Sequence, residues 1–274
     1  MVREGGLRSP RLASLTGPPV CRIIADIETT SSSPQPGQQA SDYRFLGGSQ
    51  ELLRRAAQSL AGAGTGDDAA GAGQSIDDEV RALSRFIADA DHELNAEVIR
   101  ASLEANPMRG GREHRVAFLP DAERVLKVAD ARMLATESLF DYLTDLVLSN
   151  HYFDDDIRLE GGYTEGGRLY IVTTQPYISG IHPDWPELRA GLARHQLRDP
   201  APRSLGGNFI FDDDLLGEVD VFDLHPNNVI EDASGWLNPI DAHFYFDDRI
   251  KRMAALRKLG LLASKPPPVP GDEE

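Results

Sequence analysis

Hydrophobic residues change their spacing partway along this 274-residue chain. Before residue 110, apolar positions recur at intervals of three or four, which predicts amphipathic helices over residues 49–61, 75–90 and 93–105. The first 48 residues are rich in Pro, Ser, Gly and Gln and are expected to form a disordered tail, with a short strand over 21–27. A flexible Gly/Ala-rich linker is expected over 62–73.

After residue 110, short apolar runs replace the helical spacing. Strands are predicted over 114–119, 123–128, 157–164 and 168–173, with one helix over 136–149. Glu165-Gly166-Gly167 is a hairpin signal between the last two strands. The remainder is less regular, with a short helix over 186–197, apolar runs over 208–222 and 228–246, and a Pro-rich tail over 265–274. This order favours an α+β fold over a regularly alternating parallel sheet.

Composition and charge narrow the classes of function. The chain has 44 Asp and Glu against 28 Lys and Arg, a net charge of −16, which disfavours nucleic acid and anionic membrane surfaces as partners. A single cysteine, Cys21, excludes an internal disulfide framework. Without an 18-residue apolar run or an apolar signal segment, the protein is expected to be cytoplasmic and soluble. Lysine is rare: the four lysines are Lys127, Lys251, Lys258 and Lys265.

The segment around residues 219–244 carries the most specific chemistry. Asp223 ends an apolar run and Asn228 follows five positions later, before another apolar pair. Asp241 then ends a further apolar run, and the Ser234-Gly235 turn between them predicts a hairpin that brings these side chains together. Two carboxylates and an amide oxygen suit Mg²⁺, which fills its remaining positions with water and substrate phosphate.

This pattern, an Asp, an Asn five residues later, a hairpin and then Ile-Asp, resembles the catalytic and metal-binding loops of the protein-kinase-like fold. Over roughly residues 110–248 the chain looks most like the kinase-like domain of bacterial and phage polyvalent proteins. The matching segments, in order, are Gly111–Val116, Val125–Val128, Tyr142-Leu143, Asn150–Phe153, Thr174–Tyr177 and Asp223–Asn228.

The resemblance implies a role for each candidate residue. Asp223 would orient or deprotonate a hydroxyl acceptor, Asn228 and Asp241 would hold Mg²⁺, and Lys127 would contact the nucleotide phosphates. An acid from the following helix would pair with Lys127; Glu137 is chosen over Asp141 and Asp145. Gln175 and Tyr177 would belong to a hinge whose backbone contacts adenine. Gly110 and Gly111 would lie over the phosphates.

Simpler interpretations compete with these roles. Lys127 alone is typical of an edge-strand lysine in solvent, and Asp223 to Asn228 alone is compatible with a turn. His225 and His243 are expected to be structural more often than ligands or bases. The acidic runs at 154–156, 212–214 and 247–248 lack the alternating oxygen ligands and glycine of a calcium loop, so solvated turns are favoured.

Departures from the kinase pattern limit the prediction. No Gly-x-Gly-x-x-Gly is present, Val221-Phe222 precedes Asp223 where kinases have His-Arg, and Ala-His follows Asp241 where they have Phe-Gly. About 33 residues remain after Asp241, too few for an activation segment and a large helical lobe. These departures argue against a phosphorylation-regulated protein kinase and favour a compact phosphotransferase or a silent nucleotide-binding module.

The sequence therefore predicts a two-lobed, kinase-like α+β fold with a reduced C-terminal lobe. The expected parts are a disordered tail (1–48), a helical region with a linker (49–108), an N-lobe (109–178), a C-lobe (179–264) and a second tail (265–274). The expected function is ATP- and Mg²⁺-dependent phosphoryl transfer to a hydroxyl of a protein or small molecule. The alternatives are a pseudokinase module that binds nucleotide or a protein partner and, more distantly, other nucleotide chemistry on the same scaffold.

Overall fold

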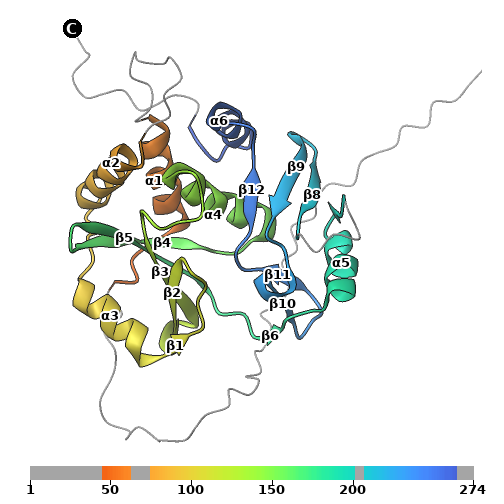
Figure 1. Cartoon of the computed structure of the whole chain (residues 1–274), viewed down its shortest axis with the longest axis horizontal. Coiled ribbons are helices and arrows are strands. Elements are labelled where there is room, and N and C mark those ends of the chain that lie inside the picture. Colours follow the sequence, from red (N-terminus) through yellow and green to blue (C-terminus); the bar gives the residue numbers. More distant parts are fainter. Residues whose placement is uncertain (1–44, 63–74, 201–206, 264–274) are drawn as a thin grey trace, which may run out of the picture.

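The computed structural model describes residues 45–62, 75–200 and 207–263, which form an α+β fold (Figure 1). Residues 1–44 of the tail predicted over 1–48, the strand over 21–27, the tail over 265–274 and most of the linker over 62–73 lie outside the described residues. Residues 45–48, assigned to the tail, belong to the fold: Phe45 is buried and the Gly48 N–H donates to Glu160 Oε2 at 2.7 Å.

A five-stranded antiparallel sheet forms the first layer. Its strands are β1 (Pro107–Met108), β2 (His114–Leu119), β3 (Arg124–Asp130), β4 (Arg158–Glu165) and β5 (Arg168–Pro176), in the order β1-β2-β3-β5-β4. The 3-10 turn η1 (Pro120–Ala122) joins β2 to β3, and Gly166 and Gly167, both at positive φ, join β4 to β5. The predicted strands and hairpin are confirmed, and β3 and β5 extend beyond their predicted ends.

Helices cover both faces of this sheet. On one face, α3 (Ala96–Ala105) places Ile99 and Leu103 in a buried cluster with Leu126 and Val128 of β3. On the other face lies α4 (Leu139–Phe153), whose Ser138 caps its N-terminus. Because side chains alternate along a strand, Lys127 points away from the α3 cluster, toward the α4 side.

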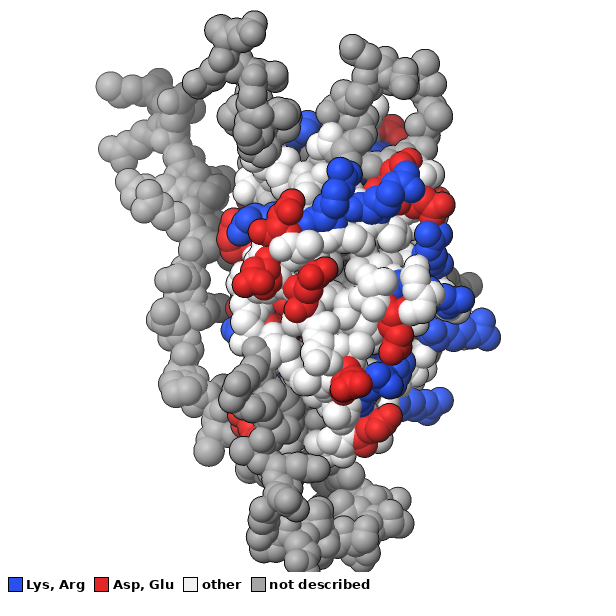
Figure 2. All heavy atoms as spheres, turned by 90° about the vertical axis from the view of Figure 1, so that its left-hand side faces the viewer, with Lys and Arg blue, Asp and Glu red and all other residues white. Residues whose placement is uncertain are grey.

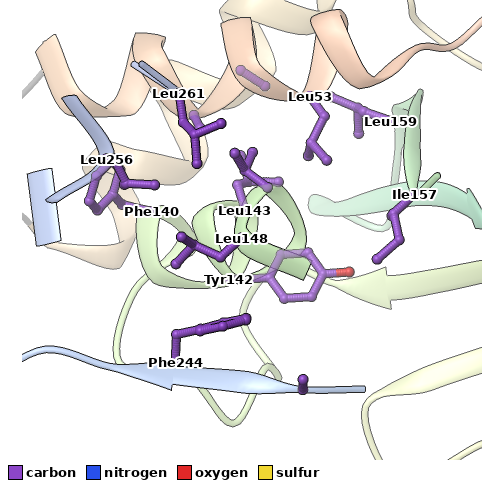
Figure 3. Close-up of a cluster of buried hydrophobic side chains, with 14 of the residues drawn as sticks. Leu53, Phe140, Tyr142, Leu143, Leu148, Ile157, Leu159, Phe244, Leu256 and Leu261 are labelled. Atoms are coloured by element: carbon purple, nitrogen blue, oxygen red, sulfur yellow. The ribbon is translucent and has the colours of Figure 1, made fainter. Parts of the chain in front are cut away.

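Three further helices surround α4. They are α1 (Gln50–Gly62), α2 (Ile76–Asp89) and, near the C-terminus, α6 (Arg249–Lys258). Leu53 of α1 packs with Phe140 and Leu143 of α4 in the main buried cluster (Figure 3). Glu79 of α2 is fully buried and accepts a hydrogen bond from the Leu139 N–H at 2.7 Å. Helices α1 and α2 of the predicted helical region are therefore packed directly on α4, whereas α3 lies on the other face of the sheet.

The rest of the chain builds two small antiparallel sheets and helix α5 (Trp185–Arg194). One sheet has the order β11-β10-β6, from β6 (Gly180–Ile181), β10 (Val229–Asp232) and β11 (Leu237–Pro239). The other has the order β12-β9-β8-β7, from β7 (Leu197–Arg198), β8 (Phe209–Asp213), β9 (Gly217–Phe222) and β12 (His243–Tyr245). The 3-10 turn η2 (Pro226–Asn228) follows β9 of the second sheet and leads into β10 of the first, so it joins the two sheets.

Acidic and basic side chains are interleaved on the face that carries α2 and α3 (Figure 2). Several of them form ion pairs, including Arg132 with Asp77, Arg81 with Asp78, and Arg100 with Glu165 at 3.6 Å. Within the described residues, no helix is both long and apolar enough to cross a membrane.

Asp156, after α4, is expected to make stability depend on pH in the acid range. Partial burial opposes its ionisation, but hydrogen bonds from Arg158, Gln50 and Arg124 outweigh burial and lower its pKa to about 2. Because this folded-state pKa lies below the unfolded value, the stabilisation is complete above about pH 4 and is lost as pH falls toward 2. Urea unfolding of wild type and Asp156→Asn should differ at pH 6, and the difference should shrink toward pH 2.

The matched control for this measurement is Asp214→Asn, which removes an exposed carboxylate. A difference between wild type and Asp156→Asn that stays constant from pH 6 to pH 2 would contradict the assigned pKa.

Candidate functional site

A cavity of about 600 Å³ lies between the five-stranded sheet and the turn η2. Its wall includes most of the residues singled out in the sequence, namely Lys127, Asn228, Asp241, Gly110, Gly111, Gln175 and Tyr177. Asp223 is not part of the wall but contacts Asn228, and Glu137 lies elsewhere. The volume is in the range of small-molecule sites.

Lys127 connects the sheet to the segment that carries Asp241. Its Nζ donates a hydrogen bond to the carbonyl oxygen of Ile240 at 2.7 Å. The side chain is therefore held inside the molecule, and the interpretation of Lys127 as a solvent-facing lysine is wrong. An ammonium has three donors, so two remain for a ligand in the cavity.

Asp241 is held in its ionised form. Burial alone would raise the pKa of this carboxyl group, but nearby positive charge, that of Lys127 first, outweighs burial and lowers it. The cavity therefore presents a carboxylate beside an ammonium at neutral pH.

Asp223 and Asn228 form one unit. Asn228 Nδ2 donates to Asp223 Oδ2 at 2.6 Å and to the Asp223 carbonyl oxygen at 3.2 Å. Asp223 has a φ of 62°, a conformation that Asp and Asn tolerate better than most residues. Burial raises the pKa of Asp223, which brings its basicity closer to that useful for accepting a proton.

The Asp223–Asn228 unit is joined to the segment that carries Asp241 by a main-chain hydrogen bond. The Ile240 N–H donates to the Asn228 carbonyl oxygen at 2.9 Å, while the Ile240 carbonyl accepts from Lys127. One residue thus links Lys127, Asn228 and, through the chain, Asp241. The hairpin predicted between Asn228 and Asp241 is confirmed as β10 and β11.

The glycine pair lies at the β1–β2 connection above the cavity. A Cβ on Gly110 would approach the His114 carbonyl oxygen to 2.3 Å, so no side chain fits at this position. A Cβ on Gly111 would meet nothing within 4 Å, which leaves the backbone open on that side. Arg109 precedes the pair and also lines the cavity, adding a positive charge that sequence reasoning missed.

The segment after β5 has fewer main-chain donors than expected for a hinge. The Tyr177 N–H donates to the Glu123 carbonyl oxygen at 2.9 Å, and Pro176 has no N–H. The predicted contact of Tyr177 with a ligand is thereby restricted to its carbonyl and side chain. Tyr177 packs on Phe118 with ring centroids 4.6 Å apart.

The acid chosen as the partner of Lys127 is not brought to it. Glu137 is exposed and precedes α4, because Ser138 caps that helix. Of the two alternatives, Asp141 contacts Ser138 and Arg252, and Asp145 contacts His243 and Arg252.

Asp155, which follows α4, is an acid that does feel the charge of Lys127. Burial raises the pKa of Asp155 to about 8, while the charge of Lys127 acts on this pKa in the opposite direction.

Two cavity histidines were also missed. His114 Nε2 lies 3.2 Å from the Tyr142 hydroxyl, and burial lowers the pKa of His114. His182 Nδ1 lies 3.0 Å from two carbonyl oxygens, those of Pro226 and Val229, so this nitrogen carries a proton and donates to them. An isolated histidine in a strand or a loop gives no sequence signal that it lines a cavity.

The histidines near Asp223 and the acidic runs have structural partners. His225 Nδ1 accepts from the Asn227 N–H at 3.2 Å. A hydrogen bond to Asp145 raises the pKa of His243 to about 9. In the acidic runs, Asp213 accepts hydrogen bonds from the N–H groups of Leu215 and Leu216, as in a turn. Within the described ranges, no cluster of three or more His, Cys, Asp or Glu side chains could hold a metal ion.

A family model described as Serine/Threonine/Tyrosine Kinase found in polyvalent proteins matches residues 77–248. The chain belongs to this kinase family. The resemblance drawn from the sequence is thus confirmed, and the match begins earlier than expected, within α2. No curated protein and no solved structure matches the chain. The matched part of this polyvalent-protein kinase domain contains every candidate site residue, whereas α1 and α6 lie outside it.

Proposed function

We propose that this kinase domain binds ATP with Mg²⁺ in the cavity and transfers the γ-phosphoryl group to a hydroxyl of a protein or small molecule. The observation that carries the proposal is the continuous set of contacts from Lys127 through Ile240 to Asn228 and Asp223, with Asp241 beside Lys127. An ammonium, an ionised carboxylate, an amide and a second carboxyl group are the parts that phosphoryl transfer requires.

The donor set fits Mg²⁺. The amide nitrogen of Asn228 is used by Asp223, which leaves its Oδ1 oxygen for a cation, and Asp241 is ionised. Mg²⁺ needs only one or two such protein ligands when phosphate oxygens and water supply the others. Bound Mg²⁺ would neutralise charge on the β- and γ-phosphates.

The protein groups have separate tasks in this proposal. Lys127 binds phosphate oxygens with its two remaining donors, and the backbone around Gly111 allows close approach of the nucleotide. Asp223, oriented by Asn228, positions the acceptor hydroxyl and takes its proton. Because transfer is direct, no covalent enzyme intermediate is required.

A second candidate is a catalytically silent domain that binds nucleotide or a protein partner. Two observations favour it: Glu137 does not reach Lys127, and the Tyr177 N–H is occupied by Glu123. Both features remove contacts that would hold and align a nucleotide, so they favour slow or absent turnover.

Millimolar ATP is expected to raise the melting temperature of the protein much more when Mg²⁺ is present than in its absence, because ligand binding to the folded state stabilises it by mass action. Differential scanning fluorimetry with ATP, MgATP and Mg²⁺ alone measures this. AMP with Mg²⁺ is the control, since it lacks the β- and γ-phosphates. A melting temperature unchanged by MgATP would rule out both nucleotide-binding candidates.

A further inference from the structure

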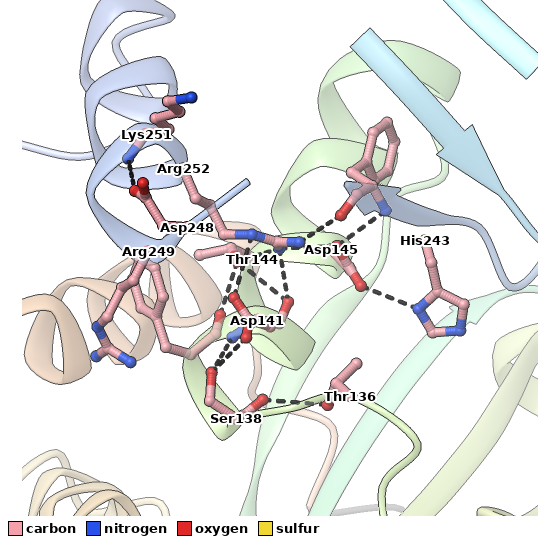
Figure 4. Close-up of polar contacts among 12 residues, drawn as sticks. Thr136, Ser138, Asp141, Thr144, Asp145, His243, Asp248, Arg249, Lys251 and Arg252 are labelled. Carbon is pink, nitrogen blue, oxygen red and sulfur yellow. Dashed lines mark hydrogen bonds and ion pairs between the residues drawn. The ribbon is translucent and has the colours of Figure 1, made fainter. Parts of the chain in front are cut away.

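Helix α6 places a buried arginine against α4 (Figure 4). Arg252 is 6% exposed, and its Nη1 donates to Asp145 Oδ1 at 2.9 Å and to Thr144 Oγ1 at 2.8 Å. Its Nε also lies 3.2 Å from Asp141 Oδ1. Asp145 is itself 3% exposed. Taking two charges out of water is costly unless each has several well-placed partners, so this pair is restricted to one geometry.

The same two charges hold the strand that follows Asp241. Asp145 Oδ2 accepts from His243 Nδ1 at 2.9 Å, and Asp145 Oδ1 accepts from the Phe244 N–H at 3.2 Å. Arg252 Nη2 donates to the Phe244 carbonyl oxygen. Both main-chain polar groups of Phe244 are therefore bound by side chains of opposite charge from α4 and α6.

The position of β12 connects this cluster to both candidate loops. β12 begins at His243, two residues after Asp241. In the β9–β12 pairing, His243 lies opposite Phe222, the residue immediately before Asp223. A displacement of β12 would consequently move the strand leaving Asp241 and the strand entering Asp223 together.

We propose that Asp145 and Arg252 are positioning residues that hold β12 so that the Asp241 carboxylate faces the cavity in the geometry needed for Mg²⁺. This inference rests on the proposed function of the cavity. Helix α6 begins at Arg249, one residue beyond the last residue that the family model matches, so Arg252 lies outside the matched range. The cluster joins the segment after Asp241 directly to α4.

Arg249, on the same helix, provides a matched control. Its guanidinium pairs with Glu79, donates to the Leu60 carbonyl oxygen at 2.8 Å and lies 4.3 Å from the centre of the Phe140 ring. These partners belong to α1, α2 and the first turn of α4, and none lies in β12. Arg249 thus anchors α6 to helices on the side away from the strand beside the candidate metal ligand.

The test compares Arg252→Lys with Arg249→Lys. Lysine keeps the charge but cannot make the several directed bonds of a planar guanidinium. We expect Arg252→Lys to raise the Mg²⁺ concentration needed for half-maximal ATP-induced stabilisation about tenfold, as for other residues that orient metal ligands. ATP affinity in EDTA should stay unchanged, and amide hydrogen exchange at Phe244 should accelerate. Arg249→Lys should lower the melting temperature while leaving the Mg²⁺ midpoint and Phe244 exchange at wild-type values.

Equal Mg²⁺ midpoints in the two variants would overturn the inference and leave the proposed function intact. A wild-type protein that does not respond to MgATP would overturn the proposed function, and the positioning role with it. If Arg252→Lys does not fold, Asp145→Asn takes its place, since it keeps the side-chain shape and removes the charge. A wild-type Mg²⁺ midpoint in folded Asp145→Asn would equally overturn the inference.

Discussion

Asp241→Asn is expected to abolish the Mg²⁺-dependent part of ATP binding. The variant keeps the size of the side chain but removes the ionised carboxylate that lies beside Lys127 in the cavity. An amide oxygen is a much weaker ligand for a hard cation, so MgATP should bind at least about tenfold more weakly. Isothermal titration with ATP in EDTA and in Mg²⁺ separates the two contributions.

The binding of ATP without metal should respond in the opposite direction. Removing one negative charge from the cavity reduces repulsion of the triphosphate and releases Lys127 from its anionic neighbour, so ATP in EDTA should bind as well as to wild type or more tightly. Asp214→Asn, which removes an exposed carboxylate elsewhere, should change neither measurement. If Asp241→Asn binds MgATP with wild-type affinity, Asp241 is not a metal ligand.

The strands and the residues of the cavity were predictable because their signals are local. β2 has the predicted bounds, since its short apolar run ends at a proline turn. The hairpin between Asn228 and Asp241 follows from a short turn flanked by apolar runs. Such features need only neighbouring residues, and the order of the motifs along the chain then indicates which of them share a site.

The partner of Lys127 shows where local signals fail. The helix was expected from residue 136, which would have placed Glu137 in its first turn. Ser138 instead accepts a hydrogen bond from the Asp141 N–H and starts the helix at Leu139, leaving Glu137 exposed before it. The side of the helix that faces Lys127 depends in addition on the packing of α1 and α2, which are distant in the sequence.

Arg252 had no sequence signal at all. Helix α6 is rich in Arg and Lys, and a charged helix near a chain end is typical of a solvated surface. Arg252 is buried only because Asp141, Thr144 and Asp145, more than a hundred positions earlier in the chain, supply its hydrogen-bond and ion-pair partners. A long-range contact of this kind is fixed by tertiary packing and cannot be read from composition or periodicity.

Asp223→Asn is expected to reduce phosphoryl transfer by about 10²- to 10⁴-fold, the usual contribution of a general base. Asparagine tolerates the positive φ at this position and still offers an oxygen to Asn228 Nδ2, so the loop should keep its shape.

MgATP binding by this variant should therefore match wild type, because Lys127, Asn228 and Asp241 are unchanged. Release of phosphate from γ-labelled ATP, measured beside the MgATP-induced melting shift, separates the two effects, and Asp214→Asn controls for the loss of a carboxylate. Equal rates in wild type and Asp223→Asn, with binding preserved in both, would show that Asp223 is not the base, and rates no faster than ATP hydrolysis without protein would identify the domain as a silent nucleotide-binding module.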